Sequence, residues 1–131
     1  MKRFFALFGF LVVLSTPSFA IVEFSKEWKS EYADKDADPD FYKTVKKANC
    51  YVCHVKGHPD KKKARNEYGN AVHEYLHKED FSKEYVKANP EEAKAKILEG
   101  LKKANEMKSS DGRTFGEKIE SKELPATDAG L

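Results

Sequence analysis

Five consecutive residues, Cys50-Tyr51-Val52-Cys53-His54, combine two thiols and an imidazole at a spacing with a well-defined chemical use. The pattern C-x-x-C-H is the attachment signature of c-type haem. Two cysteines three positions apart can each add a thiol to one vinyl group of the same porphyrin, and the following histidine supplies the proximal ligand of the iron. We therefore predict one covalent haem c, attached through Cys50 and Cys53, with His54 as the proximal axial ligand.

Other kinds of site fit these residues less well. A thioredoxin-type dithiol would need a neighbouring βαβ pattern, and the chain has no run of β-branched residues that could form such a sheet. A zinc site would need a fourth ligand, for which His58 is close in sequence. A disulfide between Cys50 and Cys53 would close a very small loop and add little stability. Haem attachment remains the favoured interpretation.

The first twenty residues have the pattern of an export signal. Lys2 and Arg3 form a basic start, residues 4–14 are a continuous apolar run, and Pro17 precedes small residues typical of a signal-peptidase site. The apolar run is far shorter than the roughly 20 residues of a membrane-spanning helix. We predict a signal peptide over residues 1–20, cleaved after Ala20, and an exported, periplasmic protein that meets the membrane only through this transient peptide. An uncleaved amphipathic anchor is the alternative.

Cysteine usage and charge agree with this prediction. Both cysteines of the chain belong to the haem signature, so a disulfide-stapled scaffold is excluded. Export removes two of the 24 basic residues, which leaves 22 basic and 22 acidic side chains and argues against general nucleic-acid binding. Lys61-Lys62-Lys63 with Arg65 forms a local basic cluster, which is either a solvated loop or a docking surface or charge partner for the haem propionates.

Periodic apolar residues predict helices on both sides of the haem signature. A short amphipathic helix is expected from Ser25 to about Asp34, with three aromatic residues on one face. Asp38-Pro39 has the form of an N-cap followed by a first-turn proline, and predicts a second helix that runs into Cys50. This helix would present the haem-binding residues at its C-terminal end.

Three further helical segments are expected after the signature. One covers residues 66–78. Another begins at Asn89-Pro90, where Glu92 would complete a capping box, and ends at Asp111-Gly112. A short helical turn is expected over residues 114–119. The predicted organisation is a signal peptide (1–20), a lead-in helix and linker (21–40), a cytochrome c domain (41–120) and an extended tail (121–131).

The order helix, C-x-x-C-H, loop, helix, helix, tail resembles the class I cytochrome c fold. The chain is similar in particular to small exported bacterial monohaem cytochromes, which carry an A-[KN]-C-x-x-C-H-V segment, a Lys-rich loop, an R-N-x-Y-G box and a late G-x-x-[FY]-G…L-P tail. The matching segments here are 48–55, 65–69, 112–116 and Leu124-Pro125. This resemblance implies an all-α, cytochrome c-like helical domain wrapped around one covalently attached haem, with Cys50, Cys53 and His54 as its site residues.

The second axial ligand has several candidates. Ordinary class I cytochromes have a distal methionine late in the chain, and Met107 lies on the apolar face of the predicted fourth helix. A core methionine is the competing interpretation. His73 and His77 are four residues apart and could bind a metal together, but they are expected on the helix surface. His58 follows His54 too closely to reach the other porphyrin face easily, and an open or water-filled position is the remaining alternative.

These features predict a monomeric, exported monohaem c-type cytochrome that is not an enzyme and that carries single electrons between redox partner proteins. Two alternatives share the haem but leave its iron open: a gas-binding or gas-sensing protein, and a peroxidase-like enzyme. A peroxidase normally needs polar distal residues, and no segment supplies an obvious His-Arg pair, although the sequence does not place Arg65 and Arg113.

Overall fold

The computed structural model describes residues 19–131, and over this range the fold is all-α, as predicted. Its helices are α1 (Phe19–Tyr32), α2 (Pro39–Ala48), η1 (Asn49–Val52), η2 (Lys61–Lys63), α3 (Glu67–Tyr75), η3 (Lys78–Asp80), α4 (Lys83–Ala88), α5 (Pro90–Asn105) and α6 (Phe115–Glu120). Within this range, extended backbone pairs only at two isolated antiparallel bridges. Residues 1–18, which make up most of the predicted signal peptide, lie outside the described residues. None of the described helices is long and apolar enough to cross a membrane.

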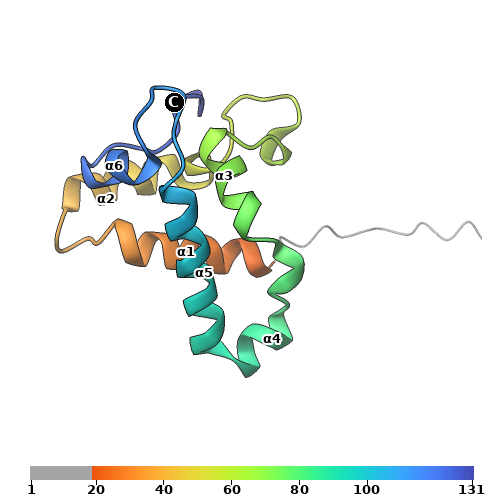
Figure 1. The fold of residues 1–131 in the computed structure, drawn as a ribbon. Coiled ribbons are helices and arrows are strands. Elements are labelled where there is room, and N and C mark those ends of the chain that lie inside the picture. The colour runs from red at the N-terminus through yellow and green to blue at the C-terminus, as the bar shows by residue number, and fades with distance from the viewer. Residues whose placement is uncertain (1–18) are drawn as a thin grey trace, which may run out of the picture.

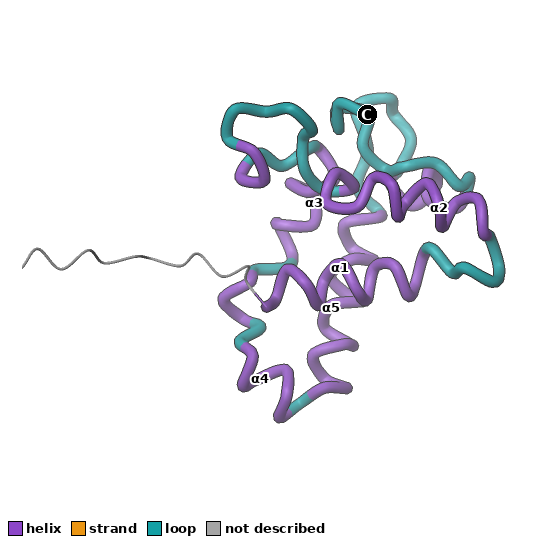
Figure 2. Tube along the Cα trace, turned by 180° about the vertical axis from the view of Figure 1, so that it is seen from behind, coloured by secondary structure: helices purple, strands orange, loops and turns teal. Residues whose placement is uncertain are grey.

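The two longest helices, α1 and α5, cross near the middle of the molecule, and α3 packs along α5 (Figure 1). α2 and α6 lie at one end of this crossing, and α4 lies at the other. The loop that follows the C-x-x-C-H segment and the C-terminal tail gather at the same end of the molecule (Figure 2). The predicted haem-binding segment therefore sits between α2 and α3 at this end.

The core draws at least one large apolar side chain from each long helix and from the short α2, α3 and α6. Its most buried members include Trp28, Val45, Tyr68, Ile97, Leu101 and Phe115. Burying each such side chain contributes about 1.5–3 kcal/mol of hydrophobic free energy. Gly100 on α5 leaves room for Leu76 at the end of α3, because a β-carbon at position 100 would overlap the Leu76 side chain. The amphipathic faces predicted from the sequence thus meet in one cluster.

The predicted starts of α2, α3, α5 and α6 are confirmed, whereas α1 begins at Phe19 and not at the predicted Ser25. Asp38 caps α2 by accepting a hydrogen bond from the Phe41 N–H at 2.9 Å, and Pro39 occupies the first turn. α5 begins at Pro90, but the predicted capping box is wrong, because the Glu92 carboxylate pairs with Lys96 at 2.7 Å instead of turning back to the backbone. A capping box does form in α6, between Thr114 and Glu117.

The predicted end of the fourth helix is also wrong. α5 stops at Asn105, and residues 106–114 form a turn closed by the bridge between Lys108 and Thr114. The Asn105 side chain bonds to Tyr68, and Ser109 and Ser110 bond to Glu67, so partners distant in sequence hold this segment outside the helix. Met107 therefore lies beyond α5 and not on its apolar face. The third helix is likewise shorter than predicted, and α4, capped by Ser82, was not predicted.

Candidate functional site

The segment Cys50–His54 forms one tight turn at the end of α2. Asn49 adopts a positive φ of 50°, which asparagine tolerates better than most residues, and so redirects the chain out of the helix. The N–H groups of Cys53 and His54 both donate to the Cys50 carbonyl, at 3.2 and 3.1 Å. The two cysteines are free thiols on this turn, both half-buried, so the structure brings Cys50, Cys53 and His54 together as the sequence predicts.

The imidazole of His54 is oriented by a main-chain carbonyl. Its Nδ1 lies 3.2 Å from the carbonyl oxygen of Ala64, which also accepts the Val55 N–H at 3.2 Å. A carbonyl is only an acceptor, so this contact selects the tautomer in which Nδ1 carries the proton. Nε2 then has the lone pair that a metal ion requires, the arrangement in which metal-ligating histidines are usually held.

Asn66 fastens the Cys50–His54 turn to α3. Its side chain is fully buried, and Nδ2 donates to the carbonyls of Tyr51, Val52 and His54 at 3.2, 3.0 and 3.3 Å. Its Oδ1 accepts the Gly69 N–H at 2.8 Å and so caps α3. One amide therefore satisfies three carbonyls of the turn and one N–H group in the first turn of the next helix.

Gly69 allows α3 to lie directly on this turn. A β-carbon at position 69 would overlap the carbonyl of Cys53, which itself accepts the Asn66 N–H at 3.0 Å. Close approach of two backbones is one of the few requirements that only glycine meets. The R-N-x-Y-G box at 65–69 is thus the structural support of the C-x-x-C-H turn.

Tyr68, the aromatic residue of the same box, links the turn to the rest of the core. Its hydroxyl accepts from Trp28 Nε1 at 2.7 Å and donates to Asn105 Oδ1 at 2.8 Å, and its ring packs edge-on against Phe115. Burial, followed by the proximity of the Cys53 thiol, raises the pKa of Tyr68 well above its usual value. The R-N-x-Y-G and G-x-x-[FY]-G boxes therefore meet through one ring contact.

Burial also raises the pKa of the Cys53 thiol, to about 12, with a smaller contribution from the neighbouring Cys50. The thiol is protonated at neutral pH as a result. Covalent attachment to a vinyl group consumes a reduced thiol, and Cys53 is a reduced thiol because it is not part of a disulfide.

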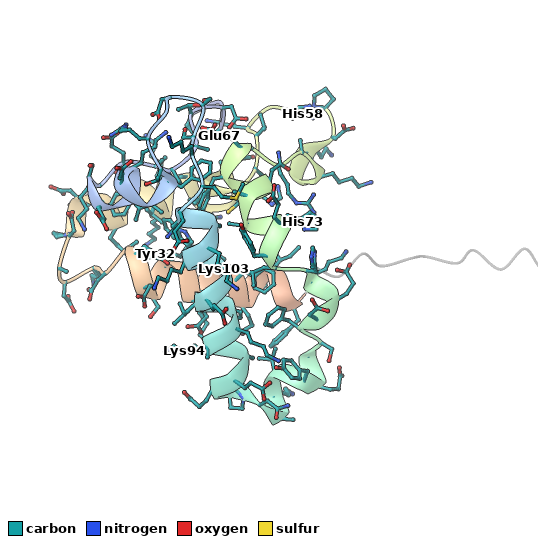
Figure 3. All side chains as sticks on the ribbon, viewed as in Figure 1. Tyr32, His58, Glu67, His73, Lys94 and Lys103 are labelled. Atoms are coloured by element: carbon teal, nitrogen blue, oxygen red, sulfur yellow. The ribbon has the colours of Figure 1, made fainter. Side chains whose placement is uncertain are left out.

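Glu67, labelled in Figure 3, ties two separate segments, residues 109–110 and 127–128, to the start of α3. Its carboxylate accepts hydrogen bonds from the Ser109 hydroxyl at 2.7 Å, the Ser110 N–H at 2.8 Å, and both the N–H and the hydroxyl of Thr127 at 2.8 Å. Burial by itself would raise the pKa of Glu67, but these bonds outweigh it and lower that pKa to about 2. The Glu67 N–H in turn donates to the Asp128 carboxylate.

The C-terminal tail is held against the turn and not free. The Lys56 N–H donates to the Ala129 carbonyl at 2.7 Å, and Pro125 is fully buried. The extended segment predicted over residues 121–131 is therefore non-helical, as expected, but it packs beside the residues that follow His54.

The candidate second ligands lie in different places. Met107 is partly buried and borders the same apolar cluster as Cys53, with its carbonyl accepting the Phe115 N–H at 3.0 Å. His73 and His77 are exposed, as predicted, with ring centres 5.1 Å apart. His58 is at the exposed loop between Val55 and Ala64, where its Nδ1 accepts the Asp60 N–H. Across residues 19–131, no set of three or more His, Cys, Asp or Glu side chains is grouped as a metal site.

The two arginines that the sequence could not place have structural roles. Arg113 forms a two-bonded pair with the Glu123 carboxylate, at 2.9 and 2.7 Å. The backbone of Arg65 pairs with that of His54 in an isolated antiparallel bridge.

The loop between His54 and Arg65 carries the exposed Lys61 and Lys63, so this basic cluster faces solvent.

Asn66, Glu67 and Gly69 were not predicted as site residues from chemistry or spacing. The only sequence indication of them was the R-N-x-Y-G box. No protein-family model, curated protein or solved structure matches this chain.

Proposed function

We propose that the chain is an exported monohaem c-type cytochrome that carries single electrons between redox partner proteins. The observation that supports this most directly is the contact between His54 Nδ1 and the Ala64 carbonyl at 3.2 Å. It gives the imidazole the tautomer of an axial ligand, directly after two free cysteines at haem-attachment spacing. A fixed tautomer is of little use to a surface histidine but is what an iron ligand requires.

The residues present fit a covalently bound haem. Cys50 and Cys53 would hold its two vinyl-derived side arms, and His54 would bind the iron. A haem so bound supplies an iron that changes its charge by one electron. Asn66 and Gly69 keep the turn from shifting, and Ala64 keeps the imidazole from rotating, so the ligand needs little reorganisation when the charge changes.

A small reorganisation of the iron ligand favours electron transfer over the two alternatives with an open iron, a gas-binding protein and a peroxidase-like enzyme. Residues 19–131 contain one thioether, Met107, which lies in the apolar border that Cys53 shares. A histidine–methionine pair raises the reduction potential and leaves no position for oxygen, carbon monoxide or peroxide. Of the two arginines in residues 19–131, Arg113 is already paired with Glu123, which leaves Arg65 to serve a peroxidase-like distal site.

The absorption spectrum of the oxidised and reduced protein, with and without carbon monoxide, tests this proposal. We expect a low-spin ferric spectrum and slow, weak carbon monoxide binding. Rapid binding of carbon monoxide to the reduced protein would favour a gas binder. Peroxide turnover with a conventional electron donor would favour an enzyme, and a spectrum without haem bands would reject all three.

A further inference from the structure

We propose that His73 and His77 form a surface site for one divalent transition-metal ion of the Zn²⁺, Ni²⁺ or Cu²⁺ class, outside the haem-attachment segment. The two imidazoles are in edge-to-face contact, with ring centres 5.1 Å apart and ring planes at 83°. A metal ion bonded to two imidazole nitrogens at about 2.1 Å each holds the ring centres roughly 5 Å apart. The rings therefore have the right separation, and one of them must turn about its side-chain bonds to bind.

The backbone that carries the pair is fixed. His73 is in the last turn of α3, and Leu76 ends the helix in an extended conformation that places His77 beyond it. Leu76 is buried against α5, where Gly100 makes room for its side chain. Because Leu76, which directly precedes His77, is anchored in the core, the separation of the two histidines does not depend on a flexible loop.

The surroundings are suited to a cation. Both imidazoles are exposed, and His73 lies on the side of α3 that faces away from α5 (Figure 3). Residues 73–80 contain three carboxylates, Glu74, Glu79 and Asp80, and one lysine, Lys78. Within this segment carboxylates outnumber the lysine, which favours cations near the pair, although Lys103 of α5 lies close to Tyr75.

The donor set defines the class of ion. Two imidazole nitrogens with the remaining positions open to water suit borderline metals, and affinity should increase from Ni²⁺ to Cu²⁺ and fall again for Zn²⁺. Ca²⁺ and Mg²⁺ prefer oxygen ligands and should not bind at this pair.

The test is calorimetric titration of the full mature chain with Zn²⁺ after removal of bound metal. It compares the parent with His73→Ala, His77→Ala, the double variant and a control, His58→Ala, which removes an exposed histidine elsewhere. If the site uses both imidazoles, the parent should bind one ion per chain there. Either single variant should bind Zn²⁺ at least about tenfold more weakly, and the double variant should lose little further affinity. The control variant should bind Zn²⁺ as the parent does. Zinc bound at Cys50 and Cys53 would add a further ion in every protein compared, so the site at His73 and His77 is measured by the ion that the variants lose relative to the parent.

Pulsed electron paramagnetic resonance with Cu²⁺ counts the bound imidazoles. We expect two in the parent and one in each single variant. The proposal would be overturned by equal Zn²⁺ affinity in all variants, or by the loss of one separate ion for each histidine removed. It would also be overturned if sedimentation showed a metal-dependent dimer. Both side chains are exposed, so the variants should melt at the same temperature as the parent.

Discussion

The α-carbon of Gly69 packs directly on the main-chain carbonyl of Cys53, so that the first turn of α3 and the C-x-x-C-H segment touch backbone to backbone. This contact joins residues that are 16 positions apart and leaves no space for a side chain. The geometry of the candidate site therefore depends on α3 as much as on the signature itself.

Gly69→Ala should force the two backbones apart. Overpacking of this kind usually costs about 1–3 kcal/mol of folding free energy. We expect a loss at or above the upper end of this range, because the obstacle is a main-chain carbonyl and not a movable side chain. Urea unfolding measures the change. The matched control is Asn70→Ala, one position along and exposed, which should stay within about 0.5 kcal/mol of the parent. Equal stability of Gly69→Ala and the parent would show that α3 does not rest on the turn.

Asn66→Asp should disturb the turn more than the helix. The aspartate keeps an acceptor for the Gly69 N–H, but it places a carboxylate beside the carbonyls that Nδ2 now satisfies. We expect a loss of about 2–4 kcal/mol and a lower yield of haem-loaded protein.

The control for Asn66 is Ser82→Ala, which removes a helix cap remote in sequence from the turn and should cost about 1 kcal/mol. Ser82→Ala should leave the proportion of haem-loaded protein unchanged. If both variants lose the same share of haem, Asn66 acts only through general stability.

Glu67→Gln should remove a pH-dependent part of the stability. The pKa of Glu67 is lowered in the folded protein to about 2, so its contribution is complete above its ordinary value of 4.5 and disappears as the pH falls from 4.5 towards 2. After a discount for solvent screening, we expect a deficit of about 1–2 kcal/mol at pH 7 that shrinks through this window.

Urea unfolding of the Glu67 variant at pH 7, 4 and 3 measures this effect. Glu99→Gln is the control, since Glu99 forms a solvent-exposed pair with Lys103 on one helix and its loss should leave the free energy of unfolding nearly unchanged. A deficit of Glu67→Gln that is the same at every pH would contradict the lowered pKa.

Met107→Ala tests the second axial ligand. If the thioether binds the iron, the ferric spectrum should change from low-spin to high-spin and the reduced protein should bind carbon monoxide readily. Leu98→Ala is the control, because Leu98 is also partly buried against the core and its loss should affect stability but not spin state. A low-spin parent that is indifferent to Met107→Ala would point to a histidine ligand instead.

The sequence predicted what is encoded locally. The attachment signature is contiguous, and the Asp38-Pro39 start of α2 follows from cap and proline chemistry within four residues. The all-α class followed from apolar periodicity. These features need no knowledge of which segments meet.

The predictions that were wrong share one physical cause. A side chain that could bond to a neighbour in the sequence bonds instead to a residue that only the fold brings near. Glu92 was expected to cap its own helix, but Lys96 and Tyr85 take its carboxylate. Asn66 and Glu67 act through bonds to residues between 12 and 60 positions away, which no local pattern specifies. The predicted end of α5 was wrong for the same reason, since the Asn105 side chain accepts a hydrogen bond from the hydroxyl of Tyr68, which is distant in the sequence.

The intact mass of the exported chain, produced with a cytochrome c maturation system, tests the central claim most directly. We predict residues 21–131 plus the mass of one haem, unchanged after denaturation and acid–acetone extraction, and no reaction of Cys50 or Cys53 with a thiol-alkylating reagent. The Cys50→Ala, Cys53→Ala double variant should lack the added mass. A parent chain of bare mass with two alkylated cysteines would contradict the account.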